Sequence, residues 1–291
     1  MRIFFNTQCL QCHFNKNIQT ARELGTDQQA MEFAREMMRI YLRHPDASSA
    51  LEYGPEVTAL LCRMYGLEED RFREEKEISN AFVLERMDAL RRRCMEAADP
   101  VYAGLQFSIL GNYIDFSALY GEVSFEKLEE MLDKALEMEL DRGAYANLIA
   151  DLERGKKLLY LTDNAGEIGF DRIFAEAIHE KFPHLEIIFC VRGGPTLNDA
   201  TREDAEIMGI PFKIIDTGNN ICGVELDLLS EEALQALETS DVILTKGMGN
   251  VETLYGSKYS IYFAFLTKCD LIMEVFQKPF LTPMLVHQTS R

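Results

Sequence analysis

The chain has 291 residues, enough for one large domain or two ordinary ones, and its hydrophobic content of 47% is sufficient for a buried core. Its formal net charge of −18 predicts that it binds neither nucleic acid nor anionic membranes, because both would repel an acidic surface. A phosphorylated ligand would therefore need a local positive pocket.

Seven cysteines, an odd number in a chain of this size, favour reduced thiols over a disulfide framework. No run of 18 apolar residues and no signal-peptide pattern occur, so we expect a cytoplasmic protein. The sequence does not indicate an oligomeric state.

The first motif along the chain is Cys9-x-x-Cys12-His13. Its spacing fits a metal clip or a redox pair, but no second Cys/His pair at zinc spacing follows it. Structural thiols, an accessory metal site and redox chemistry all remain open.

Helical periodicity then runs to about Gly155. The capping box Thr26-x-x-Gln29 predicts one helix start. Further helices are predicted over residues 54–66, 71–98, 101–114, 125–140 and 143–152. We therefore predict an N-terminal all-helical domain over residues 1–155.

After Gly155 the pattern changes to strands that alternate with helices. Strands are predicted at about 157–162, 186–192, 212–216, 241–245 and 270–275, and helices at about 168–181, 199–208, 230–238 and 250–267. Such alternation is typical of a parallel sheet with helices on both faces. We predict a three-layer α/β/α, Rossmann-like domain with a mainly parallel sheet over residues 156–291.

Polar residues follow the first predicted strand at the point where a helix begins. Asp163 and Asn164 offer hard oxygen ligands of the kind that Mg²⁺ or Mn²⁺ prefers. Ligands of open α/β sheets bind at this edge, where strand carboxyl ends meet helix amino ends. An ordinary helix cap is the alternative interpretation of this pair.

Two further strand ends are polar and rich in glycine. The second predicted strand ends at Arg192, and Gly193-Gly194 and then Asp199 follow it. The third ends in the polar segment 216–220. Glycines let backbone amides approach a ligand closely, and Asp199 stands where the next helix is expected to begin.

The fourth predicted strand is followed by Lys246-Gly247-Met-Gly249-Asn250. A lysine beside free amides at a helix start is a phosphate-binding arrangement in outline. Neither a Walker sequence nor the G-x-G-x-x-G dinucleotide fingerprint is present. Because these polar residues gather at carboxyl ends of strands, we predict that they form one site.

In the helical half, Asn112 and Asp115 follow a nearly continuous apolar run. A buried helix of that kind must give its polar residues partners or a cavity. A helix-ending turn and a wall of the active site both satisfy this requirement.

Four strings in this order, GNYIDF, LTDNAGE with FD after it, RGGPTLNDAT and KGMGNVETL, resemble the motifs of the metal-dependent damage-control phosphatases. This family was long catalogued as a domain of unknown function and includes proteins once assigned as acidic-residue methyltransferases. The resemblance covers most of the chain, and the Cys-x-x-Cys motif is similar to the stand-alone prokaryotic branch. Asp270 replaces the proline of the family's Lys-Cys-Pro, which weakens the case for Lys268 as a phosphate ligand.

The resemblance implies that Asp163, Asn164 and Asp199 hold a divalent metal ion such as Mn²⁺, Mg²⁺, Co²⁺ or Ni²⁺. It implies that Lys246 binds phosphate, and that the segment containing Asn112 and Asp115 lines the cleft. It also implies that the substrates are small phosphorylated metabolites, such as sugar phosphates or damaged cofactor precursors.

We expect such a metal ion to activate the attacking water, while Lys246 and the amides of Gly247 and Gly249 stabilise charge on the phosphoryl oxygens. Arg192 and Asn250 complete the expected substrate-binding set.

The sequence does not identify the residue that accepts the proton of the attacking water. Glu167 is one candidate, and it could equally hold Asn164 in place. Three alternatives to this mechanism also stay open: attack on phosphorus by Asp163 itself, carboxyl methyl transfer from S-adenosylmethionine, and non-catalytic binding of a metabolite or metal.

Overall fold

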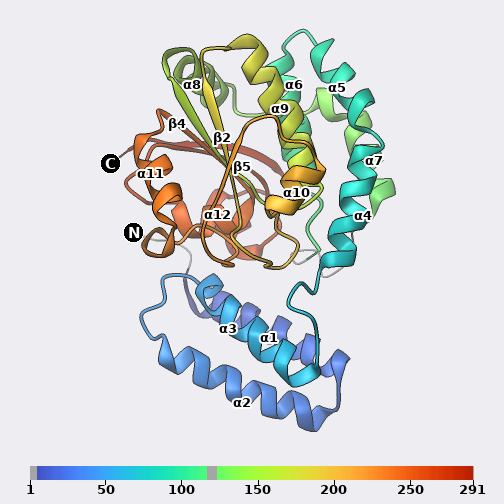
Figure 1. Ribbon diagram of the computed structural model, residues 1–291, viewed down its shortest axis with the longest axis vertical. Helices are drawn as coiled ribbons and strands as arrows, with labels where there is room; N and C mark the ends of the chain where they lie inside the picture. The colour runs from blue at the N-terminus through green and yellow to red at the C-terminus, as the bar shows by residue number, and fades with distance from the viewer. Residues whose placement is uncertain (1–4, 117–122, 291) are drawn as a thin grey trace.

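The computed structural model describes residues 5–116 and 123–290, which form a helical cap and an α/β body (Figure 1). The cap is residues 5–67. Its helices are α1 (Thr7–Leu24), α2 (Asp27–Arg43), η1 (Ala50–Tyr53) and α3 (Gly54–Tyr65). They enclose a separate core around Phe33, Met37 and Leu61. The predicted capping box is confirmed, since Thr26 and Gln29 exchange both of its hydrogen bonds.

The body begins with helices that the sequence placed in the helical half. These are α4 (Arg73–Leu84), α5 (Met87–Met95), α6 (Pro100–Gly111), α7 (Phe125–Asp133), η2 (Ala135–Glu137) and α8 (Arg142–Arg154). The prediction of one long helix over residues 71–98 is wrong, because this region forms two helices, α4 and α5. The chain turns at Glu85 and Arg86, where the Arg86 guanidinium donates to the Phe82 carbonyl and lies over the Phe82 ring.

The division of the chain at residue 155 stays a prediction. Helices α5, α6 and α8 share one apolar core with α9 (Glu167–Lys181) and with one face of the sheet. The most extensive contact between described helices is between α6 and α9, where Gly104 and Gly111 of α6 face Phe174 and Phe170. The described helices of the body therefore bury their apolar faces against the sheet domain rather than against the cap.

The described residues contain a six-stranded sheet in the order β3-β2-β1-β4-β5-β6. The strands are β1 (Lys157–Leu161), β2 (Glu186–Val191), β3 (Lys213–Asp216), β4 (Val242–Lys246), β5 (Ile261–Leu266) and β6 (Pro283–Gln288). The first five are parallel, and β6 pairs antiparallel with β5. The remaining helices are α10 (Arg202–Ile207), η3 (Leu226–Leu228), α11 (Glu231–Thr239), α12 (Gly247–Leu254) and α13 (Asp270–Phe276).

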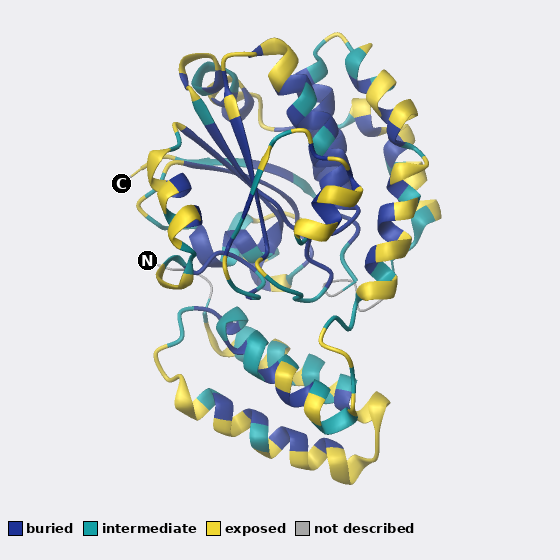
Figure 2. Ribbon diagram, in the orientation of Figure 1, coloured by how far each residue is buried: buried dark blue, intermediate teal, exposed yellow. Residues whose placement is uncertain are grey.

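The predicted three-layer α/β architecture is confirmed. Along β1, Leu158 and Tyr160 face the core under α6 and α9, while Leu159 and Leu161 face a second core under α11 and α12. Strand residues alternate between faces, so a strand with helices on both sides is apolar throughout. Figure 2 shows the result, with the strands among the most deeply buried segments.

Two predicted elements near the C-terminus are wrong. The helix expected over 250–267 ends at Leu254, and its second half is strand β5. The strand expected over 270–275 is helix α13. A short, continuous apolar run fits a buried strand and a buried helix equally well, so periodicity alone could not separate them.

The cap lies over the carboxyl edge of the sheet. The hydroxyls of Ser48 and Ser49 donate to the Glu225 carboxylate, in the connection that follows β3, at 3.1 and 2.8 Å. A cavity of about 300 Å³ separates α3 from Asn220 in the same connection. The strand order reverses between β1 and β4, and this is where ligands of open α/β sheets bind.

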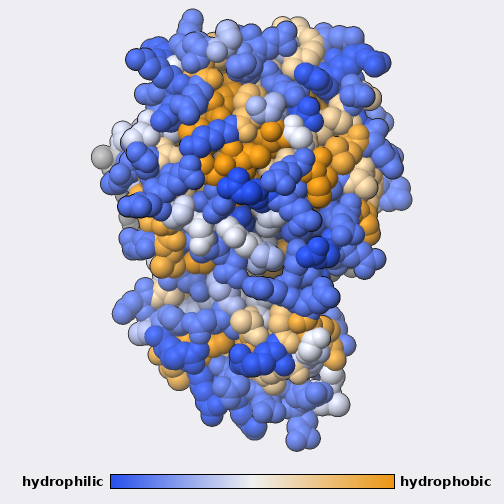
Figure 3. All heavy atoms as spheres, in the orientation of Figure 1, coloured by the Kyte–Doolittle hydropathy of each residue, from blue (hydrophilic) through white to orange (hydrophobic). Residues whose placement is uncertain are grey.

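Polar and charged side chains cover most of the face drawn in Figure 3, in keeping with the acidic composition. Among the described residues, no helix combines the length and the apolar content that a membrane crossing requires.

The contact between α6 and α9 makes a prediction for Gly104. A Cβ at this position would lie 2.9 Å from the Cα of Phe174. We expect Gly104→Ala to lower the free energy of unfolding by about 1–3 kcal/mol, through overpacking. Gly54→Ala is the matched control, because no atom lies within 4 Å of its Cβ position. Urea unfolding measures both variants, and a Gly104→Ala protein as stable as the wild type would contradict the packing described.

Candidate active site

Two loops meet at the switch point and bring the predicted metal ligands together. The first ligand loop (residues 162–166) follows β1, and the second ligand loop (residues 192–201) follows β2. Asn164 and Asp199 form a β-bridge, and the amide of Ala200 donates to the Asp163 carbonyl at 2.7 Å. Asp163, Asn164 and Asp199 are each at most 5% exposed.

The Asp163 carboxylate is held on one side only. Its Oδ2 accepts from Nδ2 of Asn112 at 2.9 Å and from Nδ2 of Asn164 at 2.7 Å. Gly247 lies so close that a Cβ there would stand 1.9 Å from the same oxygen, and its φ of +74° also favours glycine. The other oxygen, Oδ1, has no described partner closer than the Arg192 guanidinium at 3.9 Å.

Glu167 fixes the orientation of both amides. Its Oε2 accepts from Nδ2 of Asn112 at 2.9 Å and from Nδ2 of Asn164 at 2.8 Å. The amide oxygen of Asn112 is used as well, since it accepts from the backbone of Leu266. No described group donates to Oδ1 of Asn164. The Asn164 oxygen is therefore presented to a ligand while its nitrogen is held by carboxylates.

Lys246 contacts the carboxylate oxygen of Glu167 that does not bind the two amides, and its side chain is fully buried. Its Nζ donates to Oε1 of Glu167 at 2.6 Å, to Oδ1 of Asp171 at 2.9 Å and to the Ser108 carbonyl at 2.8 Å. Burial alone would lower the pKa of this amine, but the two carboxylates outweigh burial and raise the pKa. All three donors are used, so a direct contact with phosphate would require one of these bonds to break.

Arg192 braces the second ligand loop. Its Nε donates to Asp199 at 2.7 Å, and its other nitrogens donate to the Gly223 carbonyl and to Oδ1 of Asn250. Nδ2 of Asn250 donates to the carbonyls of Thr162 and Lys246. The two predicted substrate-binding residues Arg192 and Asn250 thus connect the carboxyl ends of β1, β2 and β4.

On the helical side of the site, Asn112 and Asp115 lie together with Lys268. Nζ of Lys268 donates to the Asn112 carbonyl and to the Asp115 carboxylate, both at 2.6 Å. Its charge opposes the rise in the pKa of Asp163. Lys268, which the sequence argument discounted, therefore lies at the site. Gly249 packs against Cys222, whose thiol approaches Asp199 at 3.5 Å.

The site carries more negative than positive charge. The carboxylates are Asp115, Asp163, Glu167, Asp171 and Asp199, and the cations are Arg192, Lys246 and Lys268. When all are ionised, five negative charges face three positive ones, an excess of two. Burial raises the pKa of Asp163 well above its usual range, and the neighbouring Glu167 and Asp199 carboxylates add to the rise. Burial raises the pKa of Asp199 too, against the opposing effect of Arg192.

Sequence reasoning missed three residues of the site, which are Asp171, Ser108 and Cys222. Asp171, which belongs to the FD string, was not assigned a role, although its place on the face of α9 opposite Lys246 makes it the second anion of the buried pair. Ser108 and Cys222 carry no motif that could have revealed them.

No cluster of three or more His, Cys, Asp or Glu side chains is arranged as a metal site in residues 5–116 and 123–290. The predicted ligand set differs from such a cluster, because it consists of two carboxylates and one amide. It stays a prediction, as do the individual roles of the site residues.

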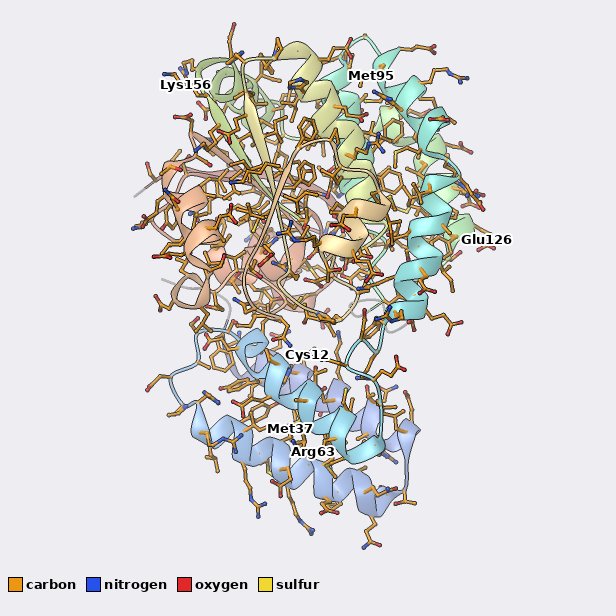
Figure 4. All side chains as sticks on the ribbon, in the orientation of Figure 1. Cys12, Met37, Arg63, Met95, Glu126 and Lys156 are labelled. Carbon is orange, nitrogen blue, oxygen red and sulfur yellow. The ribbon has the colours of Figure 1, made fainter. Side chains whose placement is uncertain are left out.

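The Cys-x-x-Cys motif lies in the first turns of α1. Cys12 is exposed on the side of the cap that faces the body (Figure 4). Cys9 packs against the second core of the body together with Cys269. Burial and the Glu252 carboxylate raise the pKa of Cys9 to about 11, which favours a structural thiol over a reactive one.

Comparison with known proteins identifies the family of the chain. The model of the damage-control phosphatase ARMT1-like domain matches residues 5–279. The chain belongs to this family.

Damage-control phosphatases of two archaea are similar to the chain. The Pyrococcus horikoshii protein is 38% identical over 178 residues, which are 60% of this chain and 61% of that protein. The Archaeoglobus fulgidus protein is 33% identical over 209 residues, which are 69% and 70% of the two chains. The crystal structure of a DUF89 family protein from Pyrococcus horikoshii aligns with a TM-score of 0.82 at 29% identity, over 97% of this chain and 98% of that one. This membership of the damage-control phosphatase family supports a phosphatase role.

The buried position of Lys246 makes a stability prediction. Lys246→Met leaves Glu167 and Asp171 buried without their cation, so we expect the free energy of unfolding to fall by about 3–5 kcal/mol. The control is Lys213→Met, which breaks an exposed pair with Glu232 and should cost less than about 1 kcal/mol. Urea unfolding of the two variants compares these costs, and equal small losses would contradict the buried network.

Asp171 makes a prediction about pH. Burial raises its pKa from 3.8 to about 6, so the folded state holds this proton more tightly than the unfolded state does. The contribution of Asp171 to stability is therefore fully present below about pH 4 and is lost as the pH rises through 6. We expect the stability of Asp171→Asn relative to the wild type to rise over this interval, by up to about 1.4 kcal/mol per pH unit. Unfolding measured from pH 4 to 7 tests this, and a constant difference would contradict it.

Proposed function

We propose that the protein is a metal-dependent phosphomonoester hydrolase, which cleaves small phosphorylated metabolites such as sugar phosphates or damaged phospho-metabolites with a metal-activated water. The observation that supports this most directly is the excess of negative charge at the site, next to Oδ1 of Asp163 and Oδ1 of Asn164, to which no described group donates. A divalent cation would neutralise that excess. The family membership supports the phosphatase part of the proposal.

The residues that would hold the metal ion are Asp163, Asn164 and Asp199. Their chemistry fits Mg²⁺, Mn²⁺, Co²⁺ or Ni²⁺, because two carboxylates and an amide oxygen are hard or borderline donors. When bound, such an ion polarises a phosphoryl oxygen and lowers the pKa of a water molecule.

The surrounding residues keep these donors in place. Glu167 holds the Asn164 amide, Asn112 holds one oxygen of Asp163, and Lys246 donates to the other oxygen of Glu167. This role for Lys246 differs from the phosphate contact that the motif implied. It also assigns Glu167 to positioning rather than to proton transfer, since both of its oxygens already accept hydrogen bonds.

Two groups remain for the phosphoryl oxygens. Lys268 makes two described hydrogen bonds through Nζ and has a third N–H to give, at the wall formed by Asn112 and Asp115. The first turn of α12, which begins at Gly247, has backbone amides without intrahelical acceptors at the same edge. Together they would supply the positive surface that an acidic protein needs to bind an anion.

The test is a phosphatase screen against sugar phosphates and phosphorylated cofactor intermediates, with Mg²⁺, Mn²⁺, Co²⁺ and Ni²⁺ varied in parallel. We expect phosphate release that stops when the metal is chelated. Asp199→Asn should lower kcat/KM at least about 100-fold, since it replaces a charged proposed ligand with a neutral amide, and loss of even an outer-shell partner costs about 10–100-fold. Asp216→Asn is the control, because Asp216 ends the neighbouring strand β3 and pairs with the exposed Arg202.

Other results would contradict the proposal. Phosphate release without a divalent ion, or a phosphoenzyme trapped on Asp163 with a beryllium fluoride analogue, would rule out attack by a metal-activated water. Methyl transfer from S-adenosylmethionine without phosphate release would support the methyltransferase alternative. Binding of metabolites without turnover would support a non-catalytic protein.

A further inference from the structure

A second buried polar network lies behind the two ligand loops and touches none of the proposed metal ligands. Its members are Asp70, Lys76, Asn80, Thr201 and Asp204. They come from the linker after the cap, from α4 and from the start of α10. Lys76, Asn80 and Asp204 are at most 5% exposed, although the site described above does not use them.

Asn80 connects the first ligand loop to this network. Its Oδ1 accepts from the backbone amide of Gly166 at 2.7 Å, and its Nδ2 donates to Oδ1 of Asp204 at 2.8 Å. Gly166 comes two residues after Asn164 and has a φ of +73°. A Cβ at Gly166 would lie 2.8 Å from Ser79, so this loop is pressed against α4 where Asn80 receives it.

Asp204 connects the second ligand loop to the same network. Its Oδ2 accepts from both the backbone amide and the hydroxyl of Thr201 at 2.8 Å. Thr201 comes two residues after Asp199. The Asn80–Asp204 hydrogen bond therefore joins two backbone positions, each two residues beyond a proposed ligand.

Lys76 connects this pair to the cap. Its Nζ lies 3.4 Å from Oδ2 of Asp204 and 3.0 Å from Oδ2 of Asp70. Asp70 belongs to the short linker between α3 of the cap and α4 of the body. A cation shared by a buried and a largely buried carboxylate is costly to remove, so this connection should be stable.

We propose that Asn80 and Asp204 form a strut that, together with the backbone bridge between Asn164 and Asp199, holds the two ligand loops at a fixed spacing, and that Lys76 anchors this strut to the linker of the cap. The two residues are positioning residues, since neither touches a proposed ligand side chain. The affinity for the metal ion then depends on a hydrogen bond outside its coordination shell. This inference rests on the proposed metal site. Partners that hydrogen-bond the ligating side chains directly change metal affinity about 10–100-fold, which is the upper bound for a strut one step further away.

The first measurement is Mn²⁺ binding by isothermal titration calorimetry. We expect Asn80→Ala to raise the Kd for Mn²⁺ about 10-fold, at the lower end of the range for partners that contact the ligands directly. Asp204→Ala should do the same, and the double variant should bind no more weakly than the weaker single variant, because both remove one strut. The matched control is Gln106→Ala, which removes another buried amide, one that donates to the Leu136 and Met138 carbonyls in the body. It should lose stability without a change in the Kd.

The second measurement is hydrogen–deuterium exchange of the metal-free proteins, and it does not depend on metal binding. Asn80→Ala should speed exchange in both loops, around residues 163–168 and 199–204, whereas Gln106→Ala should leave both unchanged. Faster exchange in one loop only, or an unchanged Kd in an Asn80→Ala protein that has lost stability, would overturn the strut. If the wild type binds no Mn²⁺, the proposed function fails, and the exchange pattern alone decides whether the loops are coupled.

Discussion

The Glu167–Lys246 ion pair is the interaction on which the rest of the site depends. Both side chains are fully buried, and such a pair is stable only when additional hydrogen bonds satisfy its remaining atoms. Asn112, Asn164, Asp171 and Ser108 supply those bonds. Because Glu167 holds the nitrogen of the Asn164 amide, the amide oxygen must face away from Glu167.

The same pair explains why the site is acidic without being unstable. Lys246 balances one of the two charges of Glu167 and Asp171, and Arg192 balances Asp199. The remaining excess of negative charge is shared between this buried pair and Asp163, whose pKa is raised by burial and by its neighbours. A divalent cation at the proposed site would relieve that excess.

Much of the fold and the main loops of the site could be predicted, because local patterns determine them. Asp163, Asn164 and Asp199 follow strands whose periodicity is clear, and parallel strands bring their carboxyl ends to one edge. The segment of strand β5 was predicted as a helix and the segment of helix α13 as a strand, since the periodicity of short apolar runs does not distinguish the two. The partners of Lys246 could not be predicted either. Ser108 and Asp171 meet it only after α6 and α9 have packed together, and no local pattern encodes that contact.

The most direct test of the account is a crystal structure with Mn²⁺, located by its anomalous scattering. The account predicts one strong peak between the two ligand loops, coordinated by Asp163, Asp199 and Oδ1 of Asn164, with the Asn164 nitrogen still bound to Glu167. A peak at another place in the chain, or an Asn164 amide turned so that its nitrogen faces the ion, would contradict it.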